Sequence, residues 1–303
     1  MNADLSRNPA LTVVATYRRA IGASLERVWE NVLDWEHLPW LHSRSFADIR
    51  CEDAGEWGWR AEVRYPGTDQ LSNIELSTDR DASRYVTRVL DGPGSGGEIW
   101  TTLSTAGEHV TDIVVEFCAK VPSGVDAKSL GDGYLALYER LWDEDETMMQ
   151  QRQTALDGRG AASELPTASS VATPSPAATL APVATPPPVA TPIVLGSVDE
   201  VRSGLPLHIE ALGVRMRIIE IDGAWVLHSL TCPHLLGPLD DCEVVDGKVT
   251  CPWHGYRFDL ASGRSCDGRR LRLACPFELE VDRVGDRVRL VPRAAAGSGD
   301  TTP

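Results

Sequence analysis

The pattern of apolar and polar positions near the N-terminus predicts a strand followed by a short helix. The strand spans residues 11–21, and Ser24 is a suitable N-cap for a helix that begins after it. Pro39 predicts that regular helix stops by about residue 38. The apolar residues of this helix recur at helical spacing and form one stripe: Leu25, Val28, Trp29, Val32 and Leu33.

Strand-like runs dominate the next stretch of the chain. Five or six of them lie between residues 46 and 120, and a long helix is expected over residues 133–156. The order of strand, short helix, antiparallel meander and long helix predicts an α+β helix-grip domain over residues 1–158, similar to START and Bet v1-like proteins. Its curved sheet would wrap the long helix and leave an apolar cavity.

A second pattern of short strand-like runs separated by turns occupies residues 193–293. Asp-Gly pairs, which are frequent turn signals, occur at positions 222, 246 and 267. We therefore expect a small all-β domain here, followed by a disordered tail over residues 294–303.

The composition of residues 159–192 differs abruptly from that of both flanking regions. This segment is rich in Pro and Ala, repeats the sequence VATP three times, and holds one Arg, one Glu and no aromatic residue. It cannot bury enough apolar surface to offset the entropy lost on ordering. We expect a disordered linker with semi-rigid polyproline stretches.

The charge and length narrow the class of protein. The 303 residues suffice for two modest domains, and the formal charge of −15 argues against nucleic acid or an anionic membrane as a partner. Residues 1–158 hold 27 acidic and 15 basic side chains, so most of the acidity lies in the first domain. Solubility would explain this excess, and so would a docking face for a basic electron donor.

No apolar run approaches the ~20 residues that span a bilayer, and the N-terminus lacks the pattern of a signal peptide. The expectation is a cytoplasmic protein. Seven cysteines are an odd number spread along a long chain, which favours metal ligation over a disulfide framework.

Two short cysteine–histidine motifs lie in the second domain. Cys232 and His234 form a C-x-H motif, and after sixteen intervening residues Cys251 and His254 form a C-x-x-H motif. Each loop thus offers one thiolate and one imidazole, and Gly255 allows the backbone to approach closely. A Cys2His2 zinc site and a purely structural role for these side chains are the alternatives.

The segment TCPHLLGPLDDCEVVDGKVTCPWHGYRFDLASG resembles a Rieske [2Fe-2S] domain. The resemblance implies that the two motif cysteines bind one iron of the cluster and the two motif histidines bind the other. Leu236 and Trp253 stand where the high-potential respiratory type has additional cysteines. The resemblance is therefore to the ferredoxin and oxygenase type, with a potential toward the ~−150 mV end of the Rieske range.

A further motif lies at the end of the first predicted helix. Residues 29–42 read WENVLDWEHLPWLH and resemble the ENxxDxxHxxxxH segment of Rieske non-haem iron oxygenases, whose catalytic domain is a helix-grip fold. The resemblance implies that His37 and His42 bind a mononuclear Fe(II). It also implies that Asp34 links a cluster histidine to His37 and carries the electron path, with Asn31 as a polar residue behind the ligands. On a helical wheel, positions 31, 34 and 37 fall opposite the apolar stripe, as a solvated face would.

The third ligand in that family is a carboxylate. On the predicted long helix, Asp145 falls in the middle of an apolar stripe and Glu144 at its edge. A carboxylate in such a stripe is costly unless it is paired or bound to a metal. The sequence WDEDETMMQQRQ also resembles the family's acidic segment, so Asp145 is the predicted ligand and Glu144 the second choice. A helix that frays after Trp142, with its acids in solvent, is the alternative.

Together these resemblances imply a Rieske-type mono- or dioxygenase with a [2Fe-2S] cluster and a mononuclear Fe(II). It would take electrons from a reductase or ferredoxin and use O2 to hydroxylate, dihydroxylate or demethylate an apolar or aromatic small molecule. The family places the Rieske domain first and passes electrons between subunits of a ring, whereas the order here is reversed. A trimer, and transfer within or between chains, therefore stay open. The alternative is an iron-free domain for hydrophobic ligands, fused to a Rieske ferredoxin.

Overall fold

The computed structural model describes residues 5–121, 123–163, 191–273 and 275–293. Within them the chain forms two compact units, one mainly from the first 155 residues and one mainly from the rest. The first unit contains, in chain order, β1 (Thr12–Ile21), α1 (Leu25–Leu33), α2 (Leu38–Leu41), β2 (Asp48–Gly55), β3 (Gly58–Arg64), β4 (Leu71–Asp79), β5 (Arg84–Val89), β6 (Glu98–Gly107), β7 (Val110–Ala119) and α3 (Ala127–Ser163).

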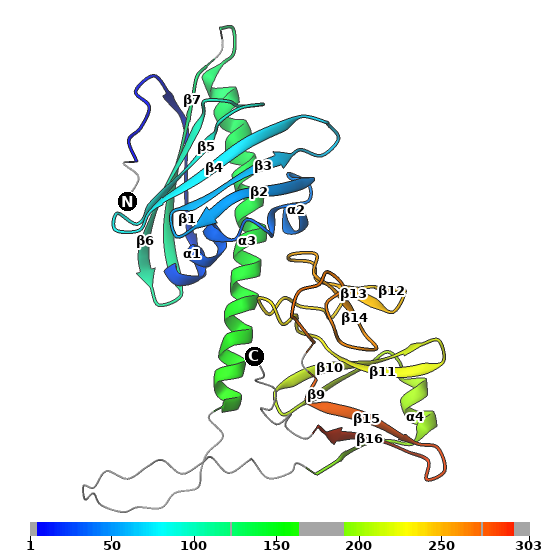
Figure 1. Ribbon diagram of the computed structural model, residues 1–303. Helices are drawn as coiled ribbons and strands as arrows, with labels where there is room; N and C mark the ends of the chain where they lie inside the picture. Colours follow the sequence, from blue (N-terminus) through cyan, green and yellow to red (C-terminus); the bar gives the residue numbers. More distant parts are fainter. Residues whose placement is uncertain (1–4, 122, 164–190, 274, 294–303) are drawn as a thin grey trace, which may run out of the picture. The chain divides into compact units, whose positions relative to one another are not determined.

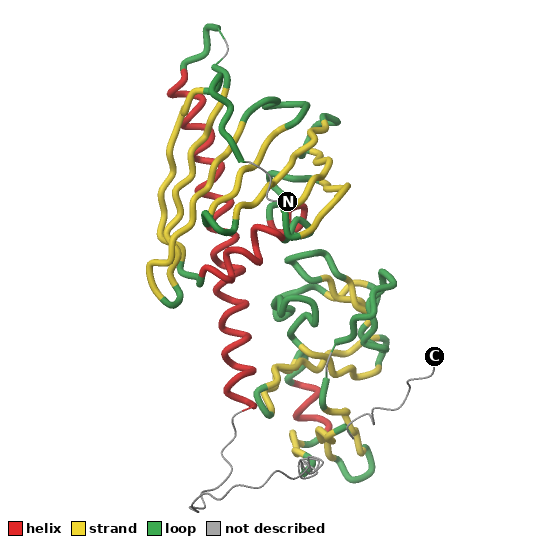
Figure 2. The backbone as a smooth tube through the Cα atoms, turned by 60° about the vertical axis from the view of Figure 1, so that its left-hand side comes forward, coloured by secondary structure: helices red, strands yellow, loops and turns green. Residues whose placement is uncertain are grey.

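A single antiparallel sheet is the framework of the first unit. Its strand order is β1-β7-β6-β5-β4-β3-β2, so the first strand closes against the last and the others follow as a meander. The long helix α3 runs across this sheet, and α1 and α2 connect β1 to β2 (Figures 1 and 2). The predicted α+β helix-grip fold is confirmed, with six strands between residues 46 and 120.

The apolar stripe of α1 packs against the sheet as its spacing predicts. Val28, Trp29 and Val32 are buried, and the Trp29 ring lies edge-on to Tyr85 of β5 at a centroid distance of 6.1 Å. The backbone amide of residue 27 donates to the Ser24 hydroxyl, so Ser24 is the N-cap. These contacts fix α1 on the sheet and so determine the position of the segment that follows it.

Aromatic contacts hold α3 on the same sheet. Phe117 of β7 stacks on Tyr134 at 5.0 Å and meets Tyr138 edge-on at 4.7 Å. One turn earlier, a Cβ at Gly131 would lie 2.3 Å from the carbonyl oxygen of Val14 in β1, so only glycine permits this approach. The helix begins at Ala127 and ends at Ser163, so the prediction of residues 133–156 was too short at both ends. Glycines near each end of α3 made the sequence pattern resemble the ends of a helix.

The prediction for Pro39 was wrong in detail. Regular helix ends at Leu33, and a separate four-residue helix, α2, starts at Leu38 with Pro39 in its first turn. Proline is tolerated there because the amide it lacks would have no partner within the helix. Pro39 therefore helps to start α2 rather than stopping α1.

The second unit is made of three small antiparallel sheets, which confirms the predicted all-β domain. The sheet orders are β11-β10-β9, β12-β13-β14 and β15-β16-β8 (Figure 1). Its elements are β8 (Ile193–Gly196), α4 (Val198–Ser203), β9 (Leu207–Ala211), β10 (Val214–Ile221), β11 (Ala224–Ser229), β12 (Val244–Val245), β13 (Lys248–Thr250), β14 (Arg257–Asp259), β15 (Phe277–Asp282) and β16 (Arg287–Pro292).

Two of the predicted Asp-Gly turns join neighbouring strands of this unit. Asp222 and Gly223 lie between β10 and β11 with φ values of 51° and 77°. Asp246 and Gly247 lie between β12 and β13 with φ values of 50° and 70°. Two successive positive φ values are the backbone of a type I′ hairpin turn, whose twist matches that of the strands.

The short helix α4 was not predicted. Ser197 accepts from the backbone amide of Glu200, and the Glu200 carboxylate accepts in return from the backbone amide of Ser197. This reciprocal pair is a capping box, and its S-x-x-E spacing is visible in the sequence.

The first five residues of the predicted linker are helical. Residues 159–163 belong to α3, whereas residues 164–190 and the predicted tail over 294–303 lie outside the described residues. Among the helices that the structure describes, none is both long and apolar enough to cross a membrane.

A buried arginine–histidine pair joins β10 and β11 in the second unit, where Arg217 and His228 are cross-strand partners. Arg217 donates from Nε to His228 Nε2 at 3.3 Å, and its other nitrogens donate to the backbone carbonyls of Asp240 and Cys242. His228 Nδ1 lies 3.0 Å from the carbonyl oxygen of Ser229. These partners require a neutral ring with its hydrogen on Nδ1. Burial, together with the charge of Arg217, lowers the pKa of His228 to about 4.

We predict that the second unit loses stability as the pH falls from about 6.5 toward 4. In that window an unfolded chain protonates His228 while the folded chain does not, so acid favours unfolding. The measurement is the pH dependence of the thermal midpoint of the full chain, followed by circular dichroism. His228→Gln should flatten this dependence, whereas His109→Gln, at an exposed position in the first unit, should leave it unchanged. Parallel curves for the wild type and His228→Gln would contradict the prediction.

Candidate metal centre

The two histidines of the H-x4-H motif flank helix α2. His37 precedes the helix as its N-cap residue, and His42 follows it as its C-cap residue. The backbone amide of His42 donates to the carbonyl of Leu38 at 3.1 Å, which closes the single turn. The two rings consequently face each other at a centroid distance of 5.1 Å and an angle of 72°. The single turn of α2 therefore brings the imidazoles of His37 and His42 face to face.

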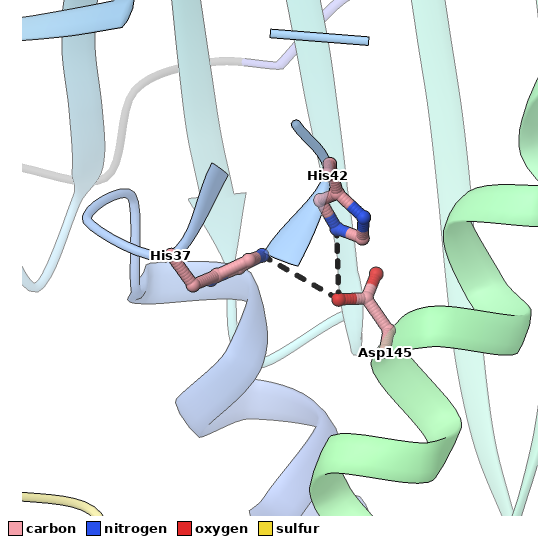
Figure 3. A group of neighbouring side chains, drawn as sticks. All are labelled: His37, His42 and Asp145. Carbon is pink, nitrogen blue, oxygen red and sulfur yellow. Dashed lines mark hydrogen bonds and ion pairs between the residues drawn. The ribbon is translucent and has the colours of Figure 1, made fainter. Parts of the chain in front are cut away.

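Asp145 reaches this pair from α3. Its Oδ1 lies 3.0 Å from His42 Nε2 and 3.4 Å from His37 Nε2 (Figure 3). The side-chain amide of Asn31 donates to the same oxygen at 2.9 Å. All four side chains are buried. The structure thus brings together His37, His42 and Asp145 as predicted, and it adds Asn31 as a direct partner of the carboxylate.

The three side chains have the geometry of ligands on one face of a metal ion. Their ligand atoms all lie within 4.8 Å of one another. Atoms bound ~2.1 Å from a metal and at right angles to one another are ~3 Å apart, close to the Nε2–Oδ1 separations seen here. Two imidazoles and one carboxylate are also the donor set of mononuclear non-haem iron sites. The residues therefore fit the Fe(II) that the family resemblance implies.

The close approach of these side chains determines the pKa values of Asp145 and His37. Burial would raise the pKa of Asp145, but the neighbouring histidines hold it well below its usual value. Burial would likewise lower the pKa of His37, but the neighbouring carboxylates of Asp145 and Asp34 raise it to about 10. The site thus holds a carboxylate that stays ionised and an imidazole that favours a positive partner at Nε2, either a proton or a metal.

The wheel interpretation of a solvated face on α1 was wrong. Asn31 and His37 are 7% and 3% exposed, because the polar side of the segment faces α3 rather than water. Asp34, the C-cap residue of α1, lies 3.6 Å from His37 Nδ1 through Oδ2. It is therefore beside the nitrogen of His37 that does not face Asp145.

The alternative carboxylate, Glu144, lies on the other side of the His42 ring from Asp145. Its Oε2 is 2.6 Å from His42 Nδ1, whereas Asp145 faces Nε2. It therefore does not share the point on which the other three ligand atoms converge. Helix α3 continues well beyond Trp142, so the alternative of a helix that frays there is also wrong.

Sequence reasoning missed the contact that holds the turn after α2. Arg140 of α3 donates from Nη2 to the hydroxyl of Ser45 at 2.9 Å, and the backbone amide of Ser45 donates to the carbonyl of His42 at 2.7 Å. The Phe46 ring then lies 6.5 Å from the His42 ring. No local pattern in the sequence pairs residues 45 and 140, because they are far apart in the chain.

The first cysteine–histidine loop is a compact turn after β11. The backbone amide of Cys232 donates to the carbonyl of Gly237, and the amide of Leu236 donates to the carbonyl of Cys232. Leu236 adopts a φ of 69°, which is uncommon for a residue with a side chain. Cys232 is 1% exposed, and His234 lies at the tip of the turn.

The second loop repeats this local conformation between β13 and β14. The backbone amide of Cys251 donates to the carbonyl of Tyr256, and the amide of Gly255 donates to the carbonyl of Cys251. Gly255 has a φ of 66°, so it occupies the left-handed position that Leu236 occupies in the first loop. Cys251 and His254 are buried. Two loops of different sequence therefore hold their cysteines in the same backbone form.

None of the seven cysteines, all of which fall within the described residues, forms a disulfide. The five outside the two motifs vary from buried to exposed: Cys51, Cys118, Cys242, Cys266 and Cys275.

Comparison with known families identifies the second unit. Residues 191–275 match the family described as the Rieske [2Fe-2S] domain. The chain therefore contains a Rieske domain, which binds a [2Fe-2S] cluster and serves electron transfer. This match favours the cluster over the alternative of a zinc site.

Several solved structures are similar to part of the chain. The XoxI protein from Bacillus cereus is 16% identical, with 45% of this chain and 94% of that chain covered and a TM-score of 0.36. A START superfamily protein from Mycobacterium smegmatis is 16% identical, with coverage of 45% and 97% and a TM-score of 0.37. The Zhui aromatase/cyclase from Streptomyces sp. R1128 is 15% identical, with coverage of 46% and 93% and a TM-score of 0.36. A comparison with curated proteins gave no match.

We predict that Gly255→Ala destabilises the second unit by about 1–2 kcal/mol, since a Cβ is strained in the left-handed region. The thermal midpoint of cluster loss should fall accordingly. Gly204→Ala is the matched control, because Gly204 has a φ of −94° and a Cβ there meets nothing closer than 3.7 Å. Equal midpoints for the two variants would contradict the strain argument.

Proposed function

We propose that this chain is a Rieske-type non-haem iron oxygenase, with electron transfer from the [2Fe-2S] cluster to a mononuclear iron. The observation that carries the proposal is the convergence of His37, His42 and Asp145 in a chain that also contains a Rieske domain. Iron held on one face by two imidazoles and a carboxylate keeps further positions open and supplies the chemistry of O2 activation.

The cluster ligands in this proposal are the residues of the two loops. Cys232 and Cys251 bind one iron of the cluster, and His234 and His254 bind the other, by the Rieske pattern. The backbone form that the two loops share supports this assignment, because it gives Cys232 and Cys251 equivalent settings.

Asp34 has the role of connecting the two centres. It lies between His37 and a cluster histidine, and so provides a short path for electrons between the two centres. Its position 3.6 Å from His37 Nδ1, on the side of the ring away from Asp145, supports the first half of this role. Asn31 holds the ligand carboxylate by donating to its Oδ1.

The substrate in this proposal is an apolar or aromatic small molecule. The core beside the site is rich in aromatic side chains, with the Phe46 ring 6.5 Å from His42 and 6.4 Å from Tyr65. Such surroundings exclude water and orient an apolar molecule by shape rather than by charge. The reaction is a hydroxylation, a dihydroxylation or an oxidative demethylation, with O2 as the second substrate.

The external electron donor is a reductase or a ferredoxin. The acidic excess of residues 1–158 suits a donor with a basic face. Members of the oxygenase family that the chain resembles form trimers, so a trimer of this chain belongs to the same proposal. The proposal holds whether electrons pass within one chain or between chains.

We expect the anaerobically purified protein to contain about three irons for every two acid-labile sulfides. His37→Ala removes one ligand of the mononuclear site, so this variant should retain the visible Rieske spectrum and about two irons for every two sulfides. His109→Ala, at an exposed position, is the control. An iron content that His37→Ala leaves unchanged would rule out the mononuclear site and favour the ligand-binding ferredoxin fusion.

Asp34→Asn should slow electron transfer between the centres by about 10–100-fold, the usual range for the loss of a residue behind metal ligands. The measurement is the rate at which O2 reoxidises the reduced cluster in a single turnover, followed by visible absorption. Metal content should not change, and Asp112→Asn, at an exposed position on β7, should behave as the wild type. Wild-type kinetics for Asp34→Asn would remove Asp34 from the electron path.

A further inference from the structure

The His42 ring is held between two consecutive residues of helix α3. Asp145 Oδ1 lies 3.0 Å from Nε2 of the ring, and Glu144 Oε2 lies 2.6 Å from Nδ1. Neighbouring helical residues point about 100° apart, so their side chains can reach opposite sides of one ring. His42 is 2% exposed in its side chain, and the contact to Glu144 is therefore largely removed from solvent on the histidine side.

The four acids at 143–146 divide into two pairs with separate tasks. Asp143 and Glu146 pair with Arg19 of β1 at 2.6 and 2.5 Å, which ties α3 to the sheet. Glu144 and Asp145 both face His42. Glu144 thus does not belong to the pair that attaches the helix, and its contact with the candidate metal centre needs a separate explanation.

The chemistry of imidazole supplies that explanation. A neutral ring carries a single hydrogen, and a nitrogen that binds a metal must present a lone pair. A hydrogen bond from Nδ1 to the Glu144 carboxylate places the hydrogen on Nδ1. Nε2 then presents its lone pair toward Asp145 and His37. A carboxylate behind a ligating histidine also increases the basicity of the ligating nitrogen.

We infer that Glu144 is the positioning residue of His42: it fixes the tautomer and the orientation of the ring, and so sets the metal affinity of the centre. This inference rests on the metal centre proposed above. The two histidines differ in this respect, because the carboxylate nearest to His37 Nδ1 is that of Asp34, at 3.6 Å, beyond a hydrogen bond. His42 is accordingly the more rigidly held of the two ligands.

The test measures Co(II) affinity of the full chain after the mononuclear metal has been removed and with the Rieske cluster intact. Glu144→Ala removes the hydrogen bond and the charge, and it should weaken Co(II) binding by about 10–100-fold. Glu144→Gln retains an acceptor for Nδ1–H and should recover most of the affinity. Glu139→Ala, on an exposed face of the same helix, is the control and should bind as the wild type. The ligand-field absorption of bound Co(II) should shift in Glu144→Ala alone.

The outcomes separate this inference from the proposed function. If the wild type binds one Co(II) and Glu144→Ala binds it within about twofold of the wild-type affinity, the inference is wrong and the metal centre stands. If the wild type binds no Co(II), the metal centre fails and the inference fails with it. A loss of affinity in Glu144→Gln as large as in Glu144→Ala would also overturn the proposed role of the hydrogen bond. The visible spectrum of the cluster reports whether each variant has folded.

Discussion

A single carboxylate oxygen connects the elements of the first unit at its candidate site. Oδ1 of Asp145 faces the Nε2 atoms of His37 and His42 and accepts from Asn31. These partners come from α1 and from both ends of α2, whereas Asp145 belongs to α3. A buried carboxylate of this kind is unfavourable unless charged or hydrogen-bonded partners surround it. Its presence therefore constrains the position of three helices at once.

Helix α3 has two tasks in this unit, and its sequence separates them. The aromatic residues of its N-terminal half pack on β7, and Gly131 allows close contact with β1. The acids at 143–146 attach the helix through Arg19 and present two carboxylates to His42. The same packing that buries apolar surface therefore also sets the distance between the histidines and their acid.

In the second unit the backbone geometry of two loops positions the candidate ligands. Its two cysteine–histidine loops have the same pair of backbone hydrogen bonds and the same left-handed residue four positions after the cysteine. The match to the Rieske [2Fe-2S] domain explains why such loops are needed, since a cluster requires its ligands at fixed separations. In the same unit, Arg217 donates hydrogen bonds to two backbone carbonyls and to a neutral His228.

The sequence by itself determined the fold class of both units, because hydrophobic periodicity and Asp-Gly turns are local signals. It also identified the two cysteine–histidine motifs and singled out Asp145, since a carboxylate in an apolar stripe is anomalous wherever the helix packs. Only the tertiary structure decided which face of α1 is buried, because the polar side that includes Asn31 meets α3 rather than water. The tertiary structure alone also placed Glu144 beside Nδ1 of His42 and paired Arg140 with the hydroxyl of Ser45. Contacts between residues about a hundred positions apart depend on how helices pack on the sheet, and no local pattern encodes that.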